Sequence, residues 1–412
     1  MKLGSRKAVF GAAATTAIYL GAVALVGSRA TPAPRPAPPA QAAAQAQPAA
    51  LPLVGTAQQP VLAEQIFKNV QVLRGIPATE FMHTMGFFSA STLETCTYCH
   101  SEESDGSWEA YAQDTNPLKD TARQMIRMVN DINRINFAGA QVVTCFSCHQ
   151  GAELPKSIPS LAEQYAPPED FEPDMIAAQN PNAPTPDQVI DKYIQAIGGA
   201  SRVAGITSIV ARGAYEGYSV ILRGTVNFYA KAPNQQTIIF HTASGESTVA
   251  VNGREGWQAG PEDTTPFPVI ALSGPELEGL LIDARLTFPA QIKQALTRWR
   301  TGAPFTIDDR EVQVVQGNMP SGYPVKLYFD SETGLLVREV RYIKTAVGLN
   351  PYQIDFGNYK EVSGVKLPSH MVITWTDGFS KMDFDIIEVN VPIPAAVFNQ
   401  PARPRSLQVS QR

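Results

Sequence analysis

The distribution of apolar and polar residues divides the chain into an apolar N-terminal segment and two regions of different periodicity. Lys2, Arg6 and Lys7 precede an uncharged run over residues 8–27 that is rich in Ala, Val and Leu. This pattern is typical of an export signal, and the basic flank places the rest of the chain outside the cytoplasm. The run approaches the roughly 20 residues that span a bilayer, so residues 1–30 are either a cleaved signal peptide or a retained signal anchor.

Two stretches show neither helical nor strand periodicity. Residues 31–60 are dense in Pro and Ala, and residues 153–185 contain repeated prolines. Such stretches cannot build a core, and we interpret both as linkers. The sequence therefore predicts folded domains over residues 61–152 and 186–401, followed by a tail over residues 402–412.

The first of these regions has helical periodicity. Apolar residues recur at intervals of three and four in residues 81–88 and again in residues 125–132. In the second stretch the apolar stripe places Arg123 and Asn133 on other faces of the helix. Four of the nine methionines stand in these stretches as two pairs three residues apart, Met82 with Met85 and Met125 with Met128.

The second region alternates apolar and polar residues with a period of two. A first helix is predicted over residues 187–197 and a helical insertion over residues 275–300. Turn signals such as Asn252-Gly253 and Asp377-Gly378 separate the strands. We expect an antiparallel β domain with strands at 208–214, 220–230, 236–243, 247–251, 312–315, 325–329, 335–343, 353–362 and from 370 to 388.

Composition and charge narrow the function only slightly. With 412 residues the chain exceeds the usual size of a single core, in agreement with two folded domains. The net charge of −5 is mild and predicts no nucleic-acid partner.

The cysteines carry the sharpest chemical signal. All four stand in two copies of C-x-x-C-H, Cys96 and Cys99 before His100, and Cys145 and Cys148 before His149. This spacing is typical of covalent c-type haem, in which two thiols bond the porphyrin and the adjacent His ligates iron. A structural zinc site, two redox dithiols and two disulfides are the competing interpretations. A zinc site would not need a His after the second Cys in both copies. A thioredoxin-like dithiol would start a helix in a βαβ unit, which this region does not show, so we predict two c-type haems.

The methionine pairs supply candidates for the sixth iron ligand. Methionine sulfur is a common sixth ligand in electron-carrying cytochromes, and only one sulfur of each pair can reach an iron. The other member is then expected to pack in the core. The spacing alone does not choose between the members, and His83 competes as a ligand of the first haem.

Five segments together resemble the tetrahaem cytochrome subunit of purple-bacterial photosynthetic reaction centres. The resemblance covers about residues 61–151 and corresponds to one two-haem half of that subunit. It is carried by Asn69-Val-Gln-Val-Leu73, Phe81-Met-His-Thr-Met85, Cys96-Thr-Tyr-Cys-His100, Arg123-Gln-Met-Ile-Arg-Met-Val-Asn-Asp-Ile-Asn133 and Val143-Thr-Cys-Phe-Ser-Cys-His-Gln-Gly151.

The resemblance implies specific ligands. In that family a Met on the helix before a motif is the axial ligand, which position matching assigns to Met85 for the first iron and Met125 for the second. The helix after Met125 carries no His, so a bis-His haem is not expected. The chain has two of the family's four haem motifs.

The β region resembles the half-barrel of periplasmic lipoprotein carriers. The likeness is carried by the helix ending Ala196-Ile-Gly-Gly-Ala200, the Tyr328–Leu335 hairpin and the Phe356–Val362 strand. The predicted fold class is therefore α+β multidomain, with an N-terminal mostly helical dihaem c-type cytochrome domain and a C-terminal antiparallel β half-barrel domain.

The resulting hypothesis is a dihaem electron-transfer protein, not an enzyme, on the periplasmic side of the cytoplasmic membrane or in the periplasm. Its expected partners are redox proteins, either a photosynthetic reaction centre or a soluble electron carrier, and the membrane through the N-terminal segment. Two alternatives stay open, a dihaem peroxidase-type redox enzyme and a lipid- or lipoprotein-binding β domain with an attached cytochrome.

Overall fold

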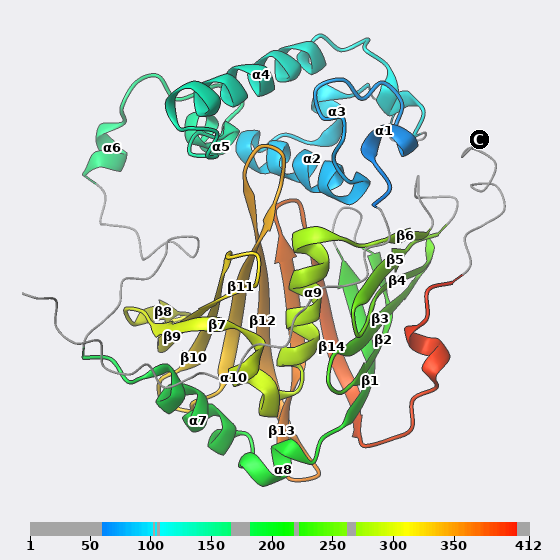
Figure 1. Cartoon of the computed structure of the whole chain (residues 1–412), viewed down its shortest axis with the longest axis vertical. Coiled ribbons are helices and arrows are strands. Elements are labelled where there is room, and N and C mark those ends of the chain that lie inside the picture. Colours follow the sequence, from blue (N-terminus) through cyan, green and yellow to red (C-terminus); the bar gives the residue numbers. More distant parts are fainter. Residues whose placement is uncertain are drawn as a thin grey trace, which may run out of the picture. The chain divides into compact units, whose positions relative to one another are not determined.

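The computed structural model describes residues 60–101, 104, 108–165, 182–217, 222–261 and 269–401 (Figure 1). These residues all belong to one compact unit, Pro48–Arg412. The predicted export segment, the first linker before residue 60, residues 166–181 of the second linker and the predicted tail lie outside the described residues. Within the described ranges, no helix combines the length and the apolar character that crossing a bilayer requires.

The first part of the described chain consists of helices joined by irregular segments. The helix α2 starts after Pro77 and ends at Leu93, whose left-handed φ of 58° closes the last turn. The elements are α1 Ala63–Ile66, α2 Ala78–Thr92, α3 Cys96–Cys99, η2 Ala110–Ala112, α4 Leu118–Asn136, α5 Cys145–His149 and α6 Leu161–Gln164.

The buried face of α4 differs from the predicted stripe. Arg123 and Asn133 are buried together with Ile126 and Val129. Both polar side chains are satisfied there, because Arg123 donates to Asp114 at 2.8 Å and Asn133 donates to the carbonyl of Val143 at 2.7 Å. Periodicity correctly predicted a helix. The buried face, however, is the one whose polar side chains make these hydrogen bonds, and not the one that carries Met125 and Met128.

The rest of the described chain is an antiparallel sheet, in the order β6-β5-β4-β3-β2-β1-β14-β13-β12-β11-β10-β9-β7, with β8 paired to β9. The strands are β1 Ser208–Gly217, β2 Leu222–Lys231, β3 Gln235–Thr242, β4 Gly245–Asn252, β5 Glu255–Ala259, β6 Val269–Ala271, β7 Thr297–Thr301, β8 Phe305–Ile307, β9 Arg310–Asn318, β10 Pro324–Asp330, β11 Leu336–Lys344, β12 Leu349–Val362, β13 Val365–Trp375 and β14 Gly378–Val389. The sheet confirms the antiparallel half-barrel predicted for the C-terminal part.

Helices accompany this sheet at its ends and on its inner face. They are α7 Pro186–Ala196, α8 Ala200–Ala204, α9 Gly274–Leu286, η3 Pro289–Gln291, α10 Ile292–Ala295 and η4 Ala395–Phe398. The helix α9 contacts β3, β4 and β5 on one side and β11 on the other, although these strands are far apart in the sheet order. The sheet therefore curves around α9 (Figure 1), and the largest apolar core lies on this inner face.

The hairpin between β11 and β12 packs against the helical part. Val347 at its tip belongs to one apolar cluster with Leu73, Phe87 and Ile126. Beside this cluster, Gln141 donates to the carbonyl oxygen of Ala346 at 2.9 Å. The core of the helical part therefore includes Val347, which belongs to the sheet that follows in sequence.

A second set of polar contacts continues this interface along α2. The His83 ring lies 3.2 Å from a carboxylate oxygen of Glu276 in the first turn of α9, and Asn350 donates to the His83 carbonyl at 2.8 Å. Burial disfavours the charged imidazole, but the attraction of Glu276 outweighs it and the pKa of His83 is raised. The His83 ring therefore pairs with Glu276 at this interface.

Candidate haem sites

The first C-x-x-C-H motif forms a single helical turn followed by an extended residue. Cys96 and Cys99 are the first and last residues of α3, and His100 follows with φ −99° and ψ 162°. Side chains three residues apart on a helix lie on one face, so both thiols point to the same side of the turn. The His100 Nδ1 lies 3.0 Å from the carbonyl oxygen of Tyr111.

The second motif also forms a helical turn, α5, but this turn includes His149 as its last residue. Thr144 and Ser147 form a reciprocal hydrogen-bonded cap that starts the turn at Cys145. His149 is buried, and its Nδ1 lies 3.0 Å from the carbonyl oxygen of Ala152. In both motifs, therefore, a backbone carbonyl is the acceptor for Nδ1–H.

These carbonyl contacts determine what each imidazole can do. A carbonyl oxygen only accepts, so the Nδ1 facing it carries the proton and the lone pair of the neutral ring is on Nε2. Such a ring is oriented to ligate a metal through Nε2. The pKa of His100 is also lowered by burial and by the charge of Lys119, which favours the neutral form that a ligand needs.

The thiols do not resemble a redox dithiol or a zinc site. None of the four cysteines forms a disulfide in the described structure. Burial raises the pKa of Cys145 to about 11 and also raises the pKa of Cys99, whereas the reactive cysteine of a redox dithiol has a lowered pKa. In the described part of the chain no three His, Cys, Asp or Glu side chains gather closely enough to hold a metal ion. The two C-x-x-C pairs thus do not combine into one metal site.

Met85 lies on the side of α2 that faces the helical core. It packs against the cluster of Leu73, Phe87 and Ile126. Each helical residue advances by about 100°, so Met85 is about 200° from His83, which contacts the sheet. Met82 is only about 40° from Gly86, where an added Cβ would lie 2.8 Å from Asp377 of the β13–β14 turn.

The second methionine pair is more exposed. Met125 is half-buried on the flank of α4, and Met128 is 51% exposed. The expectation that Met128 packs in the core is therefore wrong for the described structure. The reason is that the buried face of α4 carries Arg123 and Asn133, and Met128 lies outside that face.

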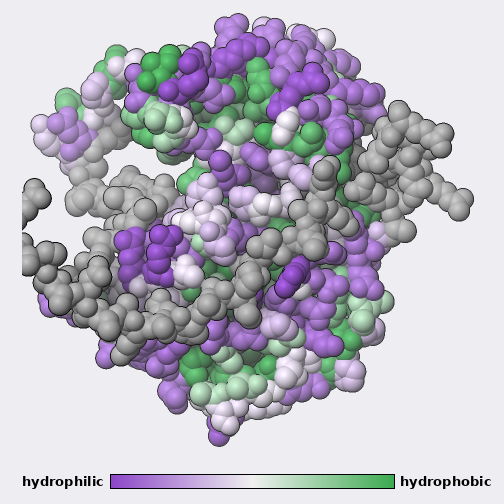
Figure 2. Space-filling model, in the orientation of Figure 1, coloured by the Kyte–Doolittle hydropathy of each residue, from purple (hydrophilic) through white to green (hydrophobic). Residues whose placement is uncertain are grey.

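The helical part exposes an unusual amount of apolar surface. Among the described residues twelve large apolar side chains are exposed, and ten of them lie between residues 93 and 165. Along the chain, Leu93 precedes the first motif by three residues and Phe146 lies within the second, and Figure 2 shows apolar patches near α5 and α6. The ten are Leu93, Met128, Ile135, Phe137, Val142, Phe146, Leu154, Ile158, Leu161 and Tyr165.

This surface fits a bulky apolar prosthetic group. The apolar core of the helical part is small. Among the described residues its cluster has four buried members, which are Leu73, Phe87, Ile126 and Val347 of the β11–β12 hairpin. Porphyrins placed beside α3 and α5 would cover exposed apolar side chains and enlarge that core. The residues present therefore fit haem at both motifs.

Sequence reasoning missed the groups that orient the two histidines. The acceptors are the main-chain carbonyls of Tyr111 and Ala152. Any residue type carries a carbonyl, so no sequence signal could have identified these two positions.

Comparison with known proteins agrees with the predicted resemblance for this part of the chain. Residues 25–196 match the family model described as photosynthetic reaction centre cytochrome C subunit. The photosynthetic reaction center cytochrome c subunit of Roseobacter denitrificans is 37% identical over 105 residues, which cover 24% of this chain and 27% of that protein. The corresponding subunit of Rubrivivax gelatinosus is 33% identical over 100 residues, covering 23% and 25%. The match thus spans about a quarter of these curated relatives.

Solved structures were also compared. A DUF1329 family protein from Desulfovibrio piger matches with a TM-score of 0.36 and 13% identity, covering 52% of this chain and 96% of that one. A LolA superfamily protein from Nitrosomonas europaea matches with a TM-score of 0.35 and 16% identity, covering 53% and 99%.

Proposed function

We propose that this chain is an electron-transfer protein that carries two c-type haems. The observation that carries the proposal is the repetition of one local structure. In each motif the two cysteines lie on one helical turn and a carbonyl holds Nδ1 of the following histidine. Cys96, Cys99, Cys145 and Cys148 would attach the haems, with His100 and Met85 as ligands of one iron and His149 and Met125 as ligands of the other.

The haems would supply a one-electron iron couple, and the protein residues would hold that couple in a fixed environment. The Tyr111 and Ala152 carbonyls keep each imidazole in one tautomer and one orientation. Methionine sulfur as the sixth ligand favours the reduced state relative to a second histidine. Two protein ligands for each iron leave no position for substrate, which suits electron transfer better than catalysis.

The proposed location and partners follow from the N-terminal pattern and the relatives. The export signal predicted over residues 1–30 directs the chain to the outer side of the cytoplasmic membrane. The relatives are subunits of photosynthetic reaction centres by name, which supports a redox partner of that kind. A soluble electron carrier is the natural second partner of a relay protein.

A redox titration of the oxidised protein tests this function. We expect two one-electron steps, and no change in the spectrum of the reduced protein on addition of carbon monoxide, because both irons have two protein ligands. The double substitution Cys96→Ala with Cys99→Ala should remove one step, and Cys145→Ala with Cys148→Ala should remove the other. Each variant is the control for the other. A carbon monoxide adduct in the wild-type protein would instead indicate an open site, as in a peroxidase-type enzyme.

A further inference from the structure

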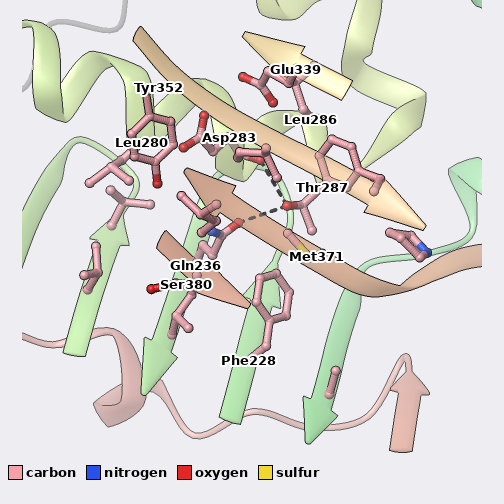
Figure 3. Close-up of a pocket in the computed structure, with 18 of the residues that line it drawn as sticks. Phe228, Gln236, Leu280, Asp283, Leu286, Thr287, Glu339, Tyr352, Met371 and Ser380 are labelled. Carbon is pink, nitrogen blue, oxygen red and sulfur yellow. Dashed lines mark hydrogen bonds between the residues drawn. The ribbon is translucent and has the colours of Figure 1, made fainter. Parts of the chain in front are cut away.

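Both parts of the described chain hold charged side chains that are largely buried. In the half-barrel, Asp283 of α9 accepts hydrogen bonds from Arg341 at 2.9 Å and 2.7 Å. This pair lies beside Glu339, which is 1% exposed, in the wall of a cavity between α9 and the inner face of the sheet (Figure 3). In the helical part, the Lys119 side chain of α4 is 10% exposed and lies beside the segment that holds His100. This second position bears directly on the first haem site.

The ammonium group of Lys119 has an acceptor for each of its three N–H bonds. Nζ donates to the Tyr111 carbonyl oxygen at 3.0 Å and to the Gln113 carbonyl oxygen at 2.6 Å, and it lies 3.0 Å from Oδ1 of Asp114. An ammonium group has three donors and no acceptor. The three contacts therefore fix its position and join the start of α4 to residues 111–114.

The Tyr111 carbonyl is shared between Lys119 and the histidine of the first motif. His100 Nδ1 lies 3.0 Å from the same oxygen. A carbonyl oxygen has two lone pairs, so it can accept from both groups. The cation is thus one hydrogen-bonded oxygen away from the imidazole proposed to ligate the first iron.

A cation at this position acts on the iron couple in one direction. The hydrogen bond from Nδ1–H increases the basicity of the imidazole, which stabilises ferric iron. A carbonyl oxygen that is already polarised by Lys119 is a weaker acceptor for that N–H, and the positive charge also opposes the extra charge of ferric iron. Both effects favour ferrous iron and therefore raise the reduction potential.

Other charged groups beside Lys119 moderate this effect. Asp114 Oδ1 also lies 2.8 Å from Arg123, and Arg123 lies 2.6 Å from Asp120. The charges of these four side chains balance, but Lys119 is the one of the four that donates to the Tyr111 carbonyl. Removing the charge of Asp114 should leave the cations less compensated, which is the opposite of removing the charge of Lys119.

The second motif has no counterpart of Lys119 within the described residues. His149 Nδ1 lies 3.0 Å from the Ala152 carbonyl oxygen, and no described side chain donates to that oxygen. Both irons are proposed to have one His and one Met ligand. The cation is therefore a difference between the two sites that ligand identity does not supply.

We propose that Lys119 is a positioning residue that holds the Tyr111 carbonyl against His100 and raises the reduction potential of the first haem. The inference rests on the proposed attachment of haem at the first motif. The second haem should not depend on Lys119.

Redox titration of the full-length protein tests this role. Lys119→Met should lower the potential of the first haem enough to shift its reduction equilibrium at least tenfold, which is about 59 mV for one electron. The potential of the second haem should not change. Lys119→Arg keeps a cation and should restore most of the potential. The variant with Cys145→Ala and Cys148→Ala keeps the first haem alone and identifies its step.

Two further variants separate charge from structure. Asp114→Asn keeps the shape of the side chain and should raise the potential of the first haem. A disordered segment around Tyr111 would not give shifts of opposite sign in Lys119→Met and Asp114→Asn. Lys68→Met removes the same charge from an exposed side chain, and it should shift the equilibrium less than about threefold because solvent and salt screen that charge.

The possible outcomes distinguish the role of Lys119 from the proposed function. A wild-type protein without haem would contradict the proposed function itself. With both haems bound, an unchanged first potential in Lys119→Met would overturn the role of Lys119. Shifts of the same sign in Lys119→Met and Asp114→Asn would overturn it as well.

Discussion

Met85 and Met82 stand three residues apart on α2 but face different surroundings. Met85 packs against the cluster of Leu73, Phe87 and Ile126, whereas Met82 lies near the α2 face that carries Gly86, next to Asp377. We propose Met85 as the ligand of the first iron. Met85→Ala should convert one haem to a high-spin or differently ligated form and lower its potential, because a soft thioether favours ferrous iron. Met82→Ala should leave the absorption spectrum nearly unchanged. Loss of the low-spin signature in Met82→Ala or His83→Ala, with Met85→Ala unaffected, would reverse this assignment.

The methionine pair on α4, Met125 and Met128, independently tests the ligand proposed for the second iron. Met125→Ala should alter the spectrum of the other haem and lower its potential in the same way. Met128 is half exposed, so Met128→Ala should change the free energy of unfolding by no more than about 0.5 kcal/mol. Denaturant unfolding and absorption spectra of both variants check this. A low-spin signature lost in Met128→Ala alone would show that the ligand is Met128.

Glu339 should make the stability of the protein depend on pH. Its pKa in the folded state is raised by burial and then by Asp283, with Arg341 acting in the opposite direction, while Tyr352 and Glu276 also lie around this group. An acid whose folded pKa is raised contributes stability that is complete below its unfolded pKa of about 4.3 and is lost as pH rises through the folded pKa.

Glu339→Gln should therefore stabilise the protein more at pH 8 than at pH 5. The gain should increase with pH by up to about 1.4 kcal/mol per unit, because the substitution removes the cost of ionising the buried carboxyl group. Urea unfolding at the two pH values measures it, with Glu388→Gln as the exposed control. An equal effect of Glu339→Gln at both pH values would mean that Glu339 does not titrate differently on folding.

At the scale of elements, the periodic pattern predicted most of the sheet. The strands β3, β10 and β11 begin and end within one residue of the predicted boundaries. The missed strands β5, β6 and β8 have three to five residues, too few for alternation to be distinguished from a loop. The predicted helical insertion is present as α9 and α10 but ends before β7.

The sequence predicted some features of the candidate haem sites and not others. The C-x-x-C-H spacing identifies the cysteines and histidines locally, because the chemistry requires that spacing. Which face of α4 is buried was not predictable, because it depends on the Arg123–Asp114 and Asn133–Val143 hydrogen bonds. Likewise, the contact of His83 with Glu276 joins residues 193 positions apart and leaves no local signal.

The β11–β12 hairpin is one of the elements that join the helical part to the sheet. Val347 is 2% exposed at its tip and packs among Leu73, Phe87 and Ile126. Val347→Ala should lower the free energy of unfolding by about 1–3 kcal/mol through lost burial and the cavity left behind. Leu349 on the same hairpin is 40% exposed, so Leu349→Ala is the matched control and should change it by less than about 1 kcal/mol. Equal effects in denaturant unfolding would show that the tip does not contribute this core.

At the scale of the whole molecule, the chain combines a helical part that matches one quarter of a reaction-centre cytochrome subunit with a β half-barrel that contains its own cavity. The shared cluster at Val347 and the contacts of His83 connect the two parts. We propose the domains over residues 61–152 and 186–401 as separate units, with electron transfer assigned to the first.

The central claim is that both C-x-x-C-H motifs carry covalent haem, and the intact mass of the denatured, exported protein tests it most directly. Thioether bonds survive denaturation, so we expect a polypeptide heavier by the mass of two haems. The variant with Cys145→Ala and Cys148→Ala should be heavier by one haem. A wild-type protein with the mass of the bare polypeptide, produced in cells that mature other c-type cytochromes, would contradict the account.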